Sequence, residues 1–276
     1  MLTFLEEQNP ILLAFLATLF TYSVTLIGAS IVFLFKKVKN VEVQKNIMDA
    51  MLGFAAGIMI AASFFSLLEP SLKMAESLKM IPWIVTTIGF ISGGLLLFIG
   101  DRIFTKIDKK ISKNKDENNK TKSLKRCIML ILSITLHNIP EGLAVGVAFG
   151  GIAYGIEGAT LSSALMIALG IGIQNFPEGT AVSVPLRREG LSRKKAFFFG
   201  QLSGLVEPIS GVLGALLVLK VRTLLPFLLA FAAGAMIYVV VEELIPESQT
   251  NKRKELMALF TLIGFSIMMI LDVALG

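Results

Sequence analysis

Apolar runs of about 20 residues recur along the whole chain, and they restrict its fold more than any other feature. A run of that length lets an α-helix cross a hydrocarbon layer roughly 30 Å thick. Lipid cannot satisfy an open backbone, so a chain that crosses it repeatedly in long apolar runs must do so as helices. Charged residues make up only 17% of the chain, below the roughly one quarter of a soluble domain. The sequence therefore predicts an all-α, polytopic membrane protein.

The apolar runs predict eight transmembrane helices within one transmembrane domain that comprises residues 1–276. Their approximate ranges are 10–35, 47–69, 81–101, 126–149, 158–186, 196–219, 224–246 and 256–275. The one long connection, residues 102–125, is rich in Lys, Asp and Asn. Such a composition cannot bury a core, so we expect a flexible loop there.

The basic residues lie on alternate connections. Of the 26 Lys and Arg residues, 22 follow the first, third, fifth or seventh predicted span. Connections rich in Lys and Arg stay in the cytoplasm. The pattern therefore predicts a multi-pass protein of the cell (plasma) membrane, with a cytoplasmic 102–125 loop and both termini outside. It also explains the basic net charge without a nucleic-acid partner.

Two pairs of similar segments indicate an internal repeat. The segment Phe54–Ile60 (FAAGIMI) returns 177 positions later as Phe231–Ile237 (FAAGAMI). The segment His137–Gly142 (HNIPEG) returns 37 positions later as Gln174–Gly179 (QNFPEG). The predicted topology makes the members of each pair antiparallel, as in secondary transporters with inverted repeats and a midplane site. The repeat comprises either spans one to four and five to eight, or spans one to three and six to eight around a central pair.

The second pair of segments places polar side chains inside the fourth and fifth predicted spans. At spacings of three and four residues, these side chains share one helix face. The faces consist of His137, Asn138 and Glu141 in the fourth span and of Gln174, Asn175 and Glu178 in the fifth. A further acid, Glu207, lies in the sixth span. Pro140 and Pro177 are predicted to kink their helices and to free the carbonyls of Leu136 and Ile173.

Three acids inside a membrane, each costing roughly 2.5–3.5 kcal/mol, need a compensating cation. One imidazole, three carboxylates and several amide oxygens suit Zn²⁺, with Fe²⁺, Mn²⁺ and Cd²⁺ as alternatives. A proton relay and structural helix pairing remain open, as does an ion-coupled secondary carrier of an organic solute. An intramembrane metalloenzyme is a further alternative, but the chain has no HExxH motif and no second histidine.

The two Pro-Glu-Gly motifs and Glu207 resemble the metal-site signatures of the ZIP (Zrt/Irt-like) family of divalent metal transporters, in particular those of its bacterial members. This resemblance implies no enzymatic activity. It implies metal uptake into the cytoplasm by elevator-type alternating access, with spans one, four, five and six moving against the others in a homodimer. It places one metal on His137, Glu141, Gln174 and Glu178, and a second on Asn138, Glu141, Asn175, Glu178 and Glu207.

Two details of the sequence modify what the resemblance implies. Some bacterial relatives carry aspartate where this chain has Asn175, so we expect the second metal to bind weakly or not at all. The acids Glu242, Glu243 and Glu247, at the inner end of the seventh span, are expected to line a cytoplasmic exit. The alternative is an interfacial acidic cluster paired with the basic residues 252–254.

Overall fold

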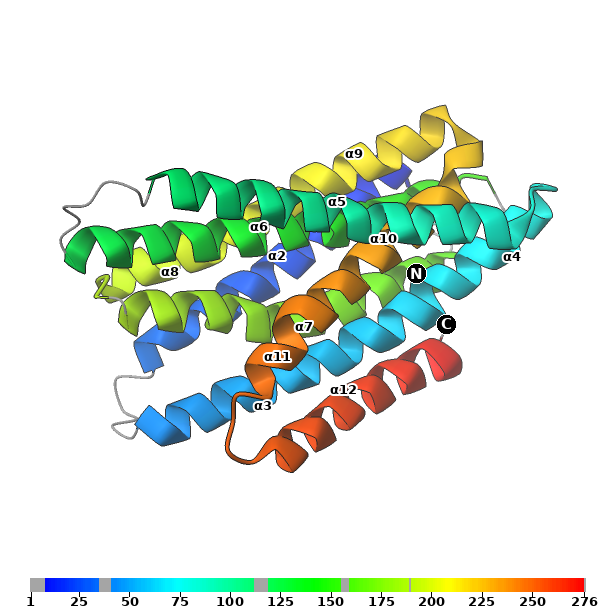
Figure 1. Cartoon of the computed structure of the whole chain (residues 1–276). Helices are drawn as coiled ribbons and strands as arrows, with labels where there is room; N and C mark the ends of the chain where they lie inside the picture. The colour runs from blue at the N-terminus through cyan, green and yellow to red at the C-terminus, as the bar shows by residue number, and fades with distance from the viewer. Residues whose placement is uncertain (1–7, 35–40, 112–118, 155–158, 189, 276) are drawn as a thin grey trace.

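The computed structural model describes residues 8–34, 41–111, 119–154, 159–188 and 190–275. Within these ranges the regular structure is helical throughout, with no strand, which confirms the all-α class. The helices run back and forth along one bundle, and the start of the first helix lies at the same end as the close of the last (Figure 1).

Eight continuous helical runs form the described bundle, and three of them change helix type along their length. They are α2 (Pro10–Leu34); α3 (Val41–Ala61), η2 (Ala62–Leu68) and α4 (Glu69–Ser77); α5 (Pro82–Ile111); α6 (Asn119–Ile152); α7 (Leu161–Arg188); α8 (Arg193–Leu202), η3 (Ser203–Leu205) and α9 (Val206–Lys220); η4 (Arg222–Leu224), α10 (Leu225–Val239), η5 (Val240–Leu244) and α11 (Ile245–Ser248); and α12 (Lys254–Leu275). Among the described residues, six runs are long and apolar enough to cross a membrane. The polar runs α6 and α7 are not among the six, so the number of eight spans stays a prediction.

Helices extend from both sides into the predicted loop at residues 102–125. Helix α5 continues to Ile111 and α6 already begins at Asn119. The predicted bounds mark where apolar residues stop, whereas the backbone hydrogen bonds of a helix can continue into water. Residues 112–118, the centre of the predicted loop, lie outside the described residues.

A proline follows each π-helical segment and the 3₁₀ turn η3, where the long runs change helix type. A proline lacks the N–H of a helical turn and clashes with the carbonyl four residues back. The π-helical segments η2 and η5 end immediately before Glu69-Pro70 and Ile245-Pro246, and the 3₁₀ turn η3 ends three residues before Pro208. Adding the repeat offset of 177 to the residue numbers of η2 gives 239–245, a range that contains η5. The two similar segments therefore have a π-helical segment at equivalent positions.

Four helix pairs pack most extensively: α2 with α7, α6 with α9, α5 with α10, and α3 with α12. In each pair a glycine lies so close to the partner's backbone that an added Cβ would overlap it, the close approach that small residues allow in membranes. Examples are Gly179 against Thr25, Gly146 against Gly211, Gly93 against Phe231, and Gly57 against Thr261.

These pairs divide the bundle into two groups. Group A comprises α2 and α6 to α9, and group B comprises α3 to α5 and α10 to α12 with their π and 3₁₀ segments. In chain order, the eight predicted spans correspond to α2, α3, α5, α6, α7, α9, α10 and α12. A repeat around a central pair makes span one equivalent to six, two to seven, three to eight and four to five. Under this equivalence the α2–α7 pair corresponds to the α9–α6 pair, and the α3–α12 pair corresponds to the α10–α5 pair. The packing therefore fits the repeat of spans one to three and six to eight around the central pair α6 and α7.

Two adjacent glycines of α5 offer a test of the close packing in group B. A Cβ at Gly93 would overlap the Phe231 carbonyl, whereas a Cβ at Gly94 would lie no nearer than 3.5 Å to any neighbour. We expect Gly93→Ala to lower the free energy of unfolding by about 2–3 kcal/mol through overpacking. The control Gly94→Ala should be neutral or slightly stabilising, because alanine favours a helix by about 1 kcal/mol over glycine. Thermal unfolding in detergent measures both, and equal effects would contradict the packing described.

Candidate metal site

The polar residues predicted from the paired motifs are buried together in group A, where α6, α7 and α9 meet. Five of them are 0% exposed, and His137 and Glu178 are 6% and 8% exposed. The five are Asn138, Glu141, Gln174, Asn175 and Glu207. Pro140 and Pro177 lie within the continuous helices α6 and α7, next to these side chains.

A hydrogen bond joins the two motifs directly. Gln174 Nε2 donates to Glu141 Oε1 at 2.6 Å, from α7 to α6. The other oxygen of each partner, Glu141 Oε2 and Gln174 Oε1, is buried without a hydrogen-bond partner. This acid–amide pair therefore retains two oxygen atoms that can still accept a donor or bind a cation.

A second acid–amide pair links α7 to α9 and α2. Asn175 Nδ2 donates to both carboxylate oxygens of Glu207, at 2.9 Å each. Thr21 Oγ1 donates to Glu207 Oε2 at 2.5 Å, and Thr25 Oγ1 lies 3.5 Å from Oε1. Both oxygens of Glu207 are thus occupied by donors of the protein itself.

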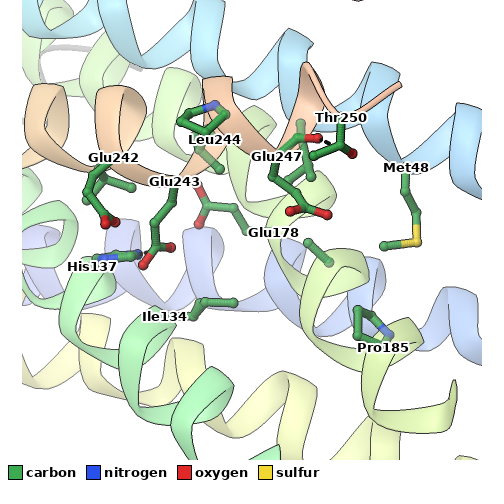
Figure 2. A pocket seen from close by; sticks show the side chains of 14 residues that line it. Met48, Ile134, His137, Glu178, Pro185, Glu242, Glu243, Leu244, Glu247 and Thr250 are labelled. Carbon is green, nitrogen blue, oxygen red and sulfur yellow. Dashed lines mark hydrogen bonds and ion pairs between the residues drawn. The ribbon is translucent and has the colours of Figure 1, made fainter. Parts of the chain in front are cut away.

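His137 and Glu178 face a cavity of about 540 Å³, which we call the inner cavity. Its wall also contains Glu242, Glu243 and Glu247, the three acids predicted for the exit. His137 Nδ1 lies 3.4 Å from Glu243 Oε2 and thereby connects α6 to η5. Figure 2 shows the imidazole beside Glu243, with Glu178 close to the same acids. The structure therefore places the predicted exit acids next to the buried site.

The one histidine and three glutamates among the predicted metal ligands do not gather around one point in this conformation. Among the described residues, no three His, Cys, Asp or Glu side chains are arranged to hold a metal ion. Two of the glutamates are paired with amides instead: Gln174 lies against Glu141, and Asn175 lies against Glu207. The other two predicted ligands, His137 and Glu178, line the inner cavity.

Comparison with known families identifies the family of the chain. A family model described as "ZIP Zinc transporter" matches residues 11–127 and 108–272, which together cover most of the chain. The chain belongs to the ZIP family. Membership confirms the resemblance drawn from the two Pro-Glu-Gly motifs, and it identifies a transporter rather than an enzyme.

Relatives within the ZIP family come from vertebrates and from bacteria. "Zinc transporter ZIP11" of Xenopus tropicalis is 38% identical over 99% of this chain and 100% of its own length. The Homo sapiens protein of the same name is 37% identical over the same shares. "Zinc transporter ZupT" of Clostridium perfringens is 34% identical over 98% of each chain. The similarity therefore extends over the whole bundle and is not confined to the motifs.

Sequence reasoning missed a row of threonines in this ZIP protein. Thr18, Thr21 and Thr25 lie on one face of α2 and are at most 1% exposed. Two of them contact Glu207, as described above. Their spacing of three and four residues in an otherwise apolar span was the available signal, but threonine is common in membrane helices.

Proposed function

We propose that this ZIP protein carries a divalent metal ion into the cytoplasm, with Zn²⁺ as its principal substrate and Fe²⁺, Mn²⁺ and Cd²⁺ as further candidates. The ion would bind among His137, Asn138, Glu141, Gln174 and Glu178, with Asn175 and Glu207 behind it. The names of the relatives, all zinc transporters, support zinc as the substrate.

The observation that carries this proposal is a set of buried oxygen atoms without donors. Among the described residues, seven buried side-chain nitrogen and oxygen atoms lack a hydrogen-bond partner, and four of the seven are oxygens of the predicted site. They are Asn138 Oδ1, Glu141 Oε2, Gln174 Oε1 and Asn175 Oδ1. Each buried polar atom without a partner costs about 1–3 kcal/mol. A cation bound beside the oxygens of Asn138, Glu141 and Gln174 would offset that cost for these three atoms, because it is attracted to each of them.

The inner cavity supports release toward the cytoplasm. Met48, Pro185 and Thr250, which line it, lie near helix ends that lead into the basic connections. Carboxylates along such a path attract a cation and, because they also contact water, bind it weakly enough to release it. Four of the residues that line the cavity are glutamates, a concentration of negative charge that suits a cation.

A second cavity supports access from the other side. This outer cavity, of about 330 Å³, is lined by Ser66, Glu69, Thr160, Asp272 and neighbouring residues. Five residues that line the outer cavity are equivalent, at the repeat offset of 177 positions, to five residues that line the inner cavity. Phe65, Ser66, Glu69, Pro70 and Lys73 correspond to Glu242, Glu243, Pro246, Glu247 and Thr250. Inverted repeats that form equivalent cavities at opposite ends are suited to alternating access.

The packing supports movement of group A against group B, the elevator-type motion implied by the family. Inside each group, glycines bring backbones together, as described above. Among the described glycines that face the other group, the neighbouring atoms belong to side chains only: Gly100 faces Leu136, Gly151 faces Leu225, and Gly170 faces Met268. Interlocked backbones resist sliding, whereas side chains can change rotamer and allow it.

The finer topology belongs to the same proposal. We infer that α6 and α7 also cross the membrane, which gives eight spans in the cell membrane with both termini outside. The exposed apolar side chains of α5 and α12, such as Ile91 and Ile263, would face lipid or a second copy in a homodimer.

Uptake by the purified protein in liposomes tests the proposed function. We expect saturable accumulation of zinc that excess Cd²⁺ reduces by competition, and none in empty liposomes. Accumulation of zinc no faster than in empty liposomes, at any zinc gradient, would contradict the proposal.

A further inference from the structure

Glu207 differs from the other acids of the site in having its hydrogen-bonding capacity already used. It is 0% exposed, and its two oxygens receive four contacts from Asn175, Thr21 and Thr25. A hydrogen bond to a charged group contributes about 1.5–3 kcal/mol, so these donors together stabilise the carboxylate strongly. By contrast, Glu141 Oε2 has no partner. The protein therefore supplies hydrogen-bond donors to both oxygens of Glu207 and leaves one oxygen of Glu141 without a donor.

The orientation of the Asn175 amide follows from chemistry. The atom that faces Glu207 also lies 3.1 Å from the backbone carbonyl oxygen of Thr21. A carbonyl oxygen can only accept a hydrogen bond, so the facing atom must be the N–H-bearing Nδ2. The amide thus presents its two hydrogens to three acceptor oxygens, and its own Oδ1 points elsewhere.

An aspartate at position 175 could not make the hydrogen bonds that the asparagine makes to Glu207 and to the Thr21 carbonyl. One of its oxygens would then face the Thr21 carbonyl and both oxygens of Glu207, and the two hydrogens that the amide now supplies would be lost. Two buried carboxylates that face one another need a shared proton or a metal ion between them, or they must move apart. This is the place at which the family resemblance puts a second metal ion.

We propose that the Asn175 amide takes the place of a second metal ion at Glu207, so that this protein binds a single ion, in the site proposed above that includes the open oxygens of Asn138, Glu141 and Gln174. Thr21 and Thr25 are positioning residues that hold Glu207 against the amide. The inference rests on the proposed function, because it presupposes a metal ion in the site. It goes further by fixing the number of ions and the residue that determines it.

Ion counting on purified protein tests this inference. Elemental analysis after equilibration with zinc and removal of free metal should give one ion per chain for the wild type and two for Asn175→Asp. Adding Glu207→Gln to Asn175→Asp removes one of the two acids and should return the count to one. The matched control is Asn9→Asp at the exposed start of α2, which keeps the cap on the Ile11 amide and should leave the count at one.

Thermal unfolding gives a second measurement that does not depend on the count. Without metal, Asn175→Asp should unfold at a lower temperature than the wild type, and zinc should raise its unfolding temperature more than that of the wild type, because ligand binding stabilises the folded state by mass action. A wild type that binds two ions, or an Asn175→Asp variant that binds one, would overturn the inference and leave the proposed function intact. A wild type that binds no zinc would overturn both.

Discussion

Replacing Glu141 by glutamine should reduce zinc uptake by about a hundredfold, and zinc affinity by a similar factor. The side chain is fully buried, and its free Oε2 is the one carboxylate oxygen among the unpartnered atoms of the site. Removing one charge from a buried charge pair costs about 2–5 kcal/mol, and about 3 kcal/mol corresponds to a hundredfold. Glutamine has the same shape and can still accept from Gln174, so the fold should persist. Radioactive zinc uptake and zinc titration measure the two effects.

The matched control is Glu255→Gln, which makes the same substitution at an exposed position in the first turn of α12. It should leave uptake within about a factor of two, because an exposed charge contributes little, about 0–1 kcal/mol. If Glu141→Gln transported zinc as well as Glu255→Gln, the ion would not depend on Glu141, and the proposed site would be wrong.

The sequence predicted which residues come together because two short-range rules act on them. Spacings of three and four residues place the polar residues of each motif on one helix face, and group A buries these two faces against each other. Similarity at an offset of 177 predicted that α3 and α10 are equivalent. The structure extends this equivalence to η2 and η5 and to the walls of the two cavities. Local spacing and repetition are both visible in a single sequence.

What the sequence could not predict depends on which helices become neighbours. The contacts of Thr21 and Thr25 with Glu207 join residues more than 180 positions apart, and nothing in either segment specifies the partner. The amide directions of Gln174 and Asn175 are decided by the acceptors around them, which exist only in the packed bundle. For the same reason, the sequence showed seven candidate ligands but not that two amides lie against two of the acids.

Tethering group A to group B should stop transport almost completely while leaving metal binding intact. Helices α7 and α12 belong to different groups and meet at Gly170 and Met268, where a Cβ built on Gly170 would lie 4.0 Å from Met268 Cγ. A cysteine at position 268 would carry its sulfur near that Cγ, within reach of a cysteine at 170 after a small adjustment. We therefore expect Gly170→Cys with Met268→Cys to form a disulfide on oxidation. Cys127→Ser should be added first, because Cys127 is the only native cysteine.

Zinc uptake before oxidation, after oxidation and after reduction measures the effect of the tether. Oxidation should abolish uptake, reduction should restore it, and zinc titration should give the same affinity in both states. The matched control is a disulfide inside group A, from Ala29→Cys with Gly200→Cys, where a Cβ at Gly200 would lie 3.1 Å from Ala29 Cβ. That bridge joins α2 to α8, which move together in the proposed mechanism, so uptake should continue.

The pair of tethers separates rigid-body movement from a fixed pore. A pore that opens by side-chain rotation alone would conduct with group A tethered to group B, and the α7–α12 bridge would then leave uptake unchanged. Loss of uptake with both bridges would show that flexibility inside group A is also needed, which the backbone contacts of Gly146 and Gly179 argue against. Only movement of one rigid group past the other predicts loss with the first bridge and continued uptake with the second.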